Sequence, residues 1–111
     1  MDKSYKEILI SEHTDDDIFD VFVKVIIQEF KAVLVHLIKN QDVRYYDFLI
    51  NEKEITLHME TFVGITLFPT KLEKANEETQ KTVDIIGLNL KLLYINHLSK
   101  DIVNQSKEEK P

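Results

Sequence analysis

The order of apolar and polar positions divides the 111-residue chain into helical and extended segments. From Phe19 to Ile38 apolar residues recur every three or four positions, the period of a helix with one buried face. This spacing predicts one long helix from Asp15 to about Lys39. The stretch 32–38 is rich in β-branched residues and suits a strand as well, and in that alternative the helix ends near Lys31.

Short extended segments flank this helix. Residues 7–11 precede it, and residues 43–50 and 55–60 follow it with β-branched and aromatic side chains or strict alternation. Residues 65–68 continue the sheet after Gly64, which can take the positive φ of a hairpin turn. If one face of the sheet carries the helices, alternation assigns the outer face to Tyr45, Asp47, Thr56, His58, Glu60, Thr66 and Phe68.

A second helix follows, with Asn76 as its expected N-cap and two glutamates in its first turn. One side of this helix carries Thr79, Val83, Ile86, Leu90, Leu93 and His97 at helical spacing. A second apolar group widens that side, so the helix is expected to be buried on most sides or to form a subunit interface. The candidate oligomer-interface residues are Ile85, Leu88, Leu92 and Ile95.

These elements give the order β-α-β-β-β-α. The simplest packing is an α+β fold of two layers, an antiparallel sheet with two long helices packed on one face. Residues 1–103 are expected to form a single domain, and the polar segment 104–111 a disordered tail.

Composition narrows the functional classes. The formal charge is −6, the lysines are scattered, and Arg44 is the single arginine, so no basic surface for nucleic acid is expected. The chain has no cysteine for disulfides or thiolate metal sites, and no window approaches the length of a membrane span. We therefore expect a cytoplasmic protein without cofactor or metal.

Five acids gather in the stretch "EHTDDDIFD", with no cation among them. With Thr14 as the N-cap, the three consecutive aspartates occupy the first helical turn, where the free amides and the helix dipole favour negative charge. Successive helical residues fan out around the axis, which disfavours a shared metal ion. The acids then face either solvent or a basic partner. This candidate patch comprises Glu12, Asp15, Asp16, Asp17 and Asp20.

His58 and Glu60 lie two apart on one strand and therefore share a face. Such a pair could do acid–base chemistry, but catalysis also needs a pocket and a third, orienting group. The chain contains no nucleophile elbow and no glycine-rich phosphate loop, so no catalytic site is predicted. Together with Tyr45, these two residues instead form a candidate partner-binding surface on the outer sheet face.

The sequence indicates a small, acidic domain without cysteine. In this general format the chain resembles the immunity proteins that neutralise bacterial toxins, and many adaptor domains. We expect a non-enzymatic module that binds a basic protein, for example an inhibitor of a nuclease-like toxin, because an acidic surface speeds encounter with a basic one. The alternative is a homodimer or assembly subunit joined through the apolar second helix.

Overall fold

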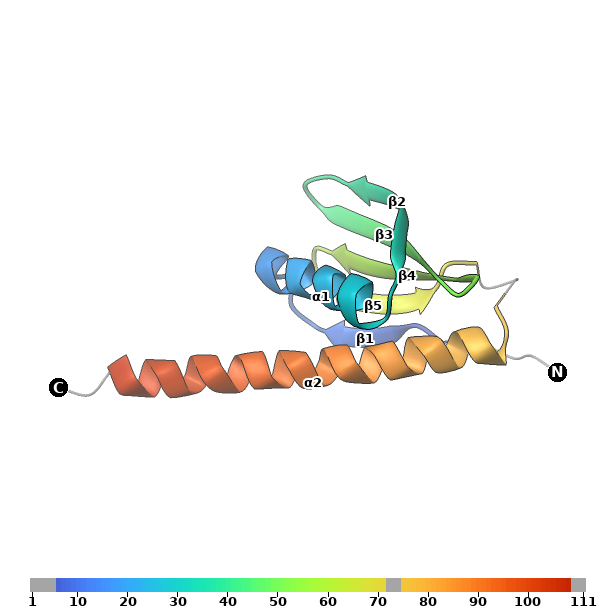
Figure 1. The fold of residues 1–111 in the computed structure, drawn as a ribbon. Helices are drawn as coiled ribbons and strands as arrows, with labels where there is room; N and C mark the ends of the chain where they lie inside the picture. Colours follow the sequence, from blue (N-terminus) through green and yellow to red (C-terminus); the bar gives the residue numbers. More distant parts are fainter. Residues whose placement is uncertain (1–5, 72–74, 109–111) are drawn as a thin grey trace.

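The computed structural model describes residues 6–71 and 75–108, with side chains as far as Ser99. Within these residues the chain is α+β, with one five-stranded antiparallel sheet and two helices, α1 (Asp16–Glu29) and α2 (Glu77–Glu108). The sheet has the spatial order β1-β5-β4-β3-β2 (Figure 1). Its strands are β1 (Ile8–Ser11), β2 (Val33–Lys39), β3 (Val43–Ile50), β4 (Lys53–Glu60) and β5 (Gly64–Pro69).

Strand register shows that both helices cover the same face of the sheet. Residues paired across antiparallel strands point to the same side, and part of one such row runs from β1 to β3. Phe19 of α1 meets one end of that row edge-on, with its ring centroid 5.1 Å from that of Tyr46. Gly87 of α2 lies against Ile8 at the other end. The row is Ile8, Leu67, Leu57 and Tyr46.

The core lies between this face and the two helices. Large side chains from α1, α2 and the central strands lose all contact with water, and each such burial contributes roughly 1.5–3 kcal/mol. The interior of the layer is formed by Phe19, Phe22, Ile26, Phe48, Ile55, Leu57, Ile65, Leu67, Val83, Ile86 and Leu90. Because these residues recur at period two in the strands and near 3.6 in the helices, the two-layer arrangement follows from the alternation of the sequence.

The expected long first helix is wrong beyond Glu29. The helix ends at Phe30, Lys31 takes a φ of 56°, and residues 33–39 form strand β2 beside β3. The alternative interpretation of the sequence, in which the helix ends near Lys31 and a strand follows, is the one that the structure shows. The physical reason is that β-branched residues suit a strand, and a strand here pairs the otherwise free edge of β3.

This change corrects the predicted order. The chain runs β-α-β-β-β-β-α rather than β-α-β-β-β-α, and α1 is only 14 residues long. Helix α2 is 32 residues long and continues through residues 104–108, where a polar tail was expected. Residues 109–111 lie outside the described part of the chain.

The predicted N-cap of α1 also shifts by one residue. Asp15 rather than Thr14 caps the helix, and its Oδ1 accepts the backbone N–H groups of Asp17 at 3.0 Å and Ile18 at 3.1 Å. An aspartate carboxylate caps with a full charge near the positive end of the helix dipole, which favours it over a threonine hydroxyl. The Asn76 cap of α2 is confirmed, since its Oδ1 accepts the N–H of Thr79 at 2.9 Å.

Gly64 provides a test of the turn between β4 and β5. Its φ is +109°, and a Cβ there would collide with the carbonyl oxygen of Ser11. We expect Gly64→Ala to lower the free energy of unfolding by about 2 kcal/mol or more. Urea denaturation followed by circular dichroism measures the change.

Gly87→Ala is the matched control, since the new Cβ would meet the tip of the Ile8 side chain at 3.0 Å and alanine favours a helix. We expect its effect to stay within about 1 kcal/mol. If both variants lowered the free energy of unfolding equally, the β4–β5 turn would have no special requirement for glycine.

Candidate functional site

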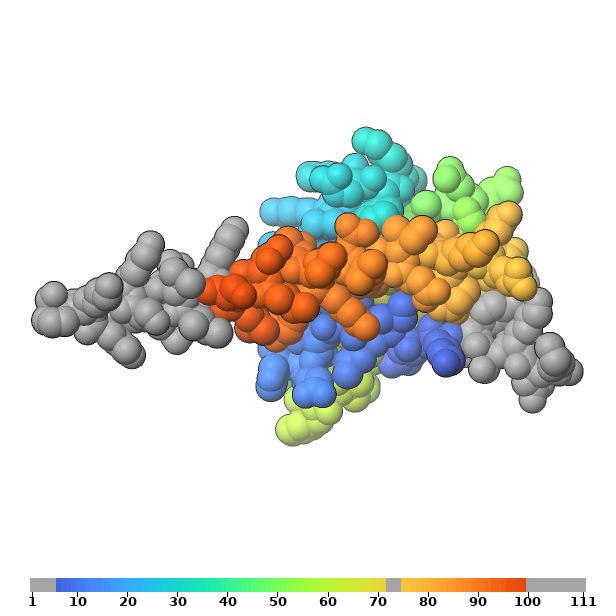
Figure 2. Space-filling view, turned by 90° about the horizontal axis from the view of Figure 1, so that it is seen from below, coloured from blue at the N-terminus to red at the C-terminus, as the bar shows by residue number. Residues whose placement is uncertain are grey.

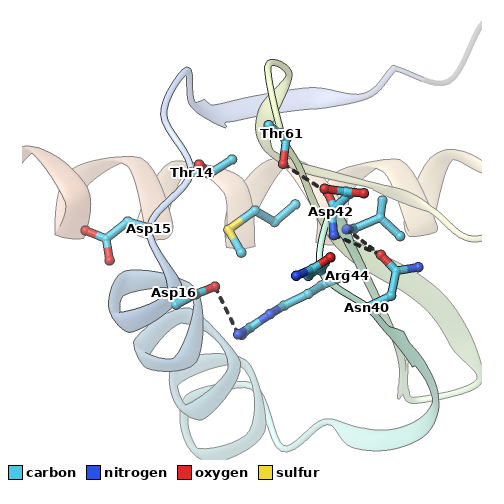
Figure 3. A pocket seen from close by; sticks show the side chains of 10 residues that line it. Thr14, Asp15, Asp16, Asn40, Asp42, Arg44 and Thr61 are labelled. Atoms are coloured by element: carbon cyan, nitrogen blue, oxygen red, sulfur yellow. Dashed lines mark hydrogen bonds and ion pairs between the residues drawn. The ribbon is translucent and has the colours of Figure 1, made fainter.

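A hollow of about 340 Å³ opens where the start of α1 meets two hairpin turns (Figure 3). The β2–β3 turn and the β4–β5 turn form the opposite rim. The lining is mostly polar and carries three carboxylates and one guanidinium. It comprises Thr14, Asp15, Asp16, Asn40, Gln41, Asp42, Val43, Arg44, Met59 and Thr61.

Short-range hydrogen bonds hold the rim in place. Asn40 Oδ1 accepts the backbone N–H groups of Asp42 at 2.9 Å and Val43 at 3.0 Å, which closes the β2–β3 turn. The carbonyl oxygen of Asp42 accepts the N–H of Thr61 at 3.1 Å, so the two turns are tied together. Asp42 therefore joins the acids of α1 at one end of the molecule, a neighbour that spacing along the chain could not reveal.

Arg44 brings a cation into the acidic patch from β3. Its Nη2 lies 2.9 Å from Asp16 Oδ1, and its Nη1 lies 3.2 Å from Asp20 Oδ1. The guanidinium carbon also lies 5.4 Å from the centre of the Phe19 ring. Two of the five acids of the predicted patch are therefore paired with this arginine. We define the acidic end as the six residues Glu12, Asp15, Asp16, Asp17, Asp20 and Asp42.

Phe62 stands at the tip of the β4–β5 turn, next to Thr61 on the rim of the hollow. Its side chain is fully exposed, and its backbone takes a φ of 69°. A bulky residue at positive φ is rare and costs on the order of 1–3 kcal/mol, so its presence needs an explanation. The sequence pattern did not single out Phe62. The signal that it lies in a turn was Gly64, two residues later.

The outer sheet face carries the residues that alternation assigned to it. Register places Leu9, Thr66, His58, Tyr45 and Ile38 in one row across all five strands. His58 stacks on Tyr45 with ring centroids 4.4 Å apart, and its Nδ1 lies 3.0 Å from Thr66 Oγ1. His58 was expected on an exposed strand face, but it is buried beneath this cover, while Tyr45 and Glu60 are half-buried. The partner-binding role of these three residues stays a prediction.

The environment of His58 favours a neutral ring. Burial lowers its pKa below the ordinary 6.5, against the carboxylates of Glu60 and Glu7, which raise it. Its Nε2 is buried without a hydrogen-bond partner among the described residues. A buried ring that stacks on Tyr45 and bonds to Thr66 in this way has the geometry of a structural histidine.

The outward side of α2 carries the four candidate interface residues, which we call the α2 stripe: Ile85, Leu88, Leu92 and Ile95. Each has an exposed fraction between 53% and 59%. Within one chain only one side of this helix packs on the sheet, so burial of the stripe stays a prediction that requires a partner. Figure 2 shows α2 running uncovered across this side of the molecule, with β1 along one flank.

Within the described residues no group of three or more histidine, aspartate or glutamate side chains is placed to hold a metal ion. None of the described helices has the length and apolar character needed to cross a membrane. No model of a known protein family matches the chain, and neither a curated protein nor a solved structure gives a significant match. The residues themselves therefore carry the functional argument.

The Arg44 cluster predicts that the arginine contributes more to stability than either acid. The side chains of Asp16 and Asp20 are 71% and 60% exposed, so we expect Asp16→Asn and Asp20→Asn each to cost less than about 1 kcal/mol. We expect Arg44→Ala to lower the free energy of unfolding by about 2 kcal/mol or more, because the aliphatic stem of Arg44 is buried in contact with the core. Arg44→Met should restore most of this stability. Urea unfolding gives the four values. An aspartate variant as unstable as Arg44→Ala would contradict this ranking.

Burial of His58 predicts a loss of stability on mild acidification. As the pH falls through 6.5, the unfolded chain takes up a proton that the folded state resists, so the free energy of unfolding falls. The loss levels off below the lowered pKa. We expect His58→Gln to reduce this dependence, measured by urea unfolding between about pH 7.5 and about pH 5.5.

His13→Gln, at an exposed ring, is the control substitution. A His58→Gln protein with the same pH dependence as the wild type would show that other groups control it.

Proposed function

We propose that this protein is a non-enzymatic binding module that recognises a basic protein through its acidic end. The observation that carries the proposal is Phe62, a fully exposed aromatic held at positive φ beside a hollow lined by carboxylates. Aromatic side chains dominate the binding energy of many protein interfaces. An inhibitor or immunity protein for a nuclease-like toxin is the concrete form, since such a toxin must carry positive charge to bind nucleic acid.

Electrostatics supports a basic partner. Six carboxylates and one guanidinium leave a local charge of about −5 at the acidic end when all are ionised. No ion pair joins Glu12 or Asp17 to another described residue, and both are exposed. A dense field of one sign speeds association with a partner of opposite charge and disfavours acidic competitors.

Arg44 supports the proposal rather than opposing it. By pairing with Asp16, which lines the hollow, and with Asp20 it orients two carboxylates and lowers their mutual repulsion. An arginine held by two acids and an aromatic ring is preorganised, so less side-chain entropy is lost when a partner docks. Phe62 then offers an apolar surface, or a ring face for a cationic side chain of the partner.

The test uses the immobilised full chain to capture a protein from native lysate and then measures its kinetics at increasing salt. We expect the wild type to capture a basic protein with a salt-sensitive association rate. Glu12→Gln with Asp17→Asn should slow association several-fold and flatten the salt dependence. Phe62→Gly should weaken affinity by about 2 kcal/mol or more, roughly thirtyfold, while relieving backbone strain.

The matched control is Glu52→Gln with Glu54→Gln, the same change in charge at the β3–β4 hairpin. Both glutamates are exposed, and antiparallel pairing puts this turn at the opposite end of β4 from Phe62. Equal association rates for the two double variants would show that only net charge matters. Undiminished binding by Phe62→Gly would overturn the assignment of the site.

A further inference from the structure

We infer that a second copy of this chain pairs with the first along the α2 stripe. This surface lies on the outward side of α2 and is independent of the acidic end. The starting observation is that α2 is apolar on two opposite sides. At 100° per residue, the buried group and the stripe lie about half a turn apart. The buried group is Val83, Ile86 and Leu90.

A single domain requires only one apolar side of a helix. The inward side of α2 already fills the core, where Val83, Ile86 and Leu90 are completely buried. Burial of the stripe contributes nothing to the folding of one chain, and its exposure to water is unfavourable. Four large aliphatic side chains on consecutive turns therefore indicate an interface rather than scattered surface residues.

The spacing of the stripe matches that of a helix–helix seam. Its members are separated by three, four and three residues, as are the a and d positions of a coiled coil. Side chains at this spacing interlock with an identical set, so the stripe is complementary to itself.

Charge favours a second copy as the occupant. A chain with a net charge of −6 repels its own copies on most approaches. The borders of the stripe are an exception: Asp84 and Lys91 on one side balance each other, and Asn89 and Asn96 on the other side are neutral. Two copies can therefore meet along α2 with little net repulsion.

The shape of the molecule permits this pairing. The sheet lies behind α2, so two helices facing each other keep the two sheets on the outside of a sheet–helix–helix–sheet arrangement. The C-terminal part of α2 runs past the edge of the sheet (Figure 1). Two facing stripes with their polar borders bury on the order of 1,000 Å², close to the lower limit of specific interfaces, so we expect a weak, reversible dimer.

The edge strand β2 is the competing surface. It exposes Val33, Val35, Leu37 and Ile38. However, its register is interrupted at Val35 and lysines flank it at both ends, two features that protect sheet edges from pairing. Helix α2, by contrast, is continuous through the stripe.

The test is sedimentation equilibrium of the purified full chain from about 1 µM to about 1 mM. We expect a monomer–dimer equilibrium. Leu88→Glu with Leu92→Glu should raise the dissociation constant at least about tenfold, because it places carboxylates in an apolar seam. Circular dichroism checks the fold, which should persist since both positions are exposed. Val35→Glu is the control on β2, with a matching exposed fraction of 52%.

Cross-linking gives a second measurement, because the chain has no native cysteine. A parallel pair should form a disulfide between two Leu88→Cys chains, and an antiparallel pair one between Leu88→Cys and Leu92→Cys chains. Val35→Cys should stay monomeric. A strict monomer at every concentration, or a dimer broken only by Val35→Glu, would overturn the inference. Either result leaves the acidic-end proposal intact, because that proposal is measured by capture of a basic protein.

Discussion

The packing of both helices on one face of β4 and β5 is the constraint on which the rest of the structure depends. Ile55, Leu57, Ile65 and Leu67 are completely buried under α1 and α2, and their alternation commits each strand to one orientation. Three consequences follow from this choice. The opposite face must be covered by its own side chains, the start of α1 comes to lie beside the hairpin turns, and α2 presents its second apolar side to solvent.

Each consequence appears at a definite place. Tyr45 stacks on His58, and His58 hydrogen-bonds to Thr66, so these side chains cover the outer face of the sheet. His58, which together with Glu60 suggests acid–base chemistry in the sequence, is therefore part of a packed layer. The start of α1 approaches β3, which lets Arg44 pair with two aspartates. The exposed side of α2 remains as an apolar strip of regular helical spacing, and Phe62 remains as an exposed aromatic at the acidic end.

Much of the fold was predictable from alternation and capping. The strands of the meander, the helix-facing residues and the Asn76 cap follow from period two, period 3.6 and local hydrogen bonding. The same signals did not determine the secondary structure of residues 33–39. Val33 and Leu37 continue the helical spacing of α1, while their β-branched neighbours favour a strand. Pairing with β3, between residues up to 16 apart, resolves that ambiguity. Likewise, the ion pairs of Arg44 join residues 24 and 28 positions apart, beyond the reach of any local pattern.

By itself, the sequence determined the charge, the α+β class, the alternation that buries one sheet face, and the apolar character of α2, because each depends on composition or on spacing within one element. Only the tertiary structure decided which acids are paired, that His58 is buried, that Phe62 stands alone at a turn, and which side of α2 remains uncovered. These properties depend on contacts between distant segments, and such contacts exist only after the strands have chosen their register and the helices their face.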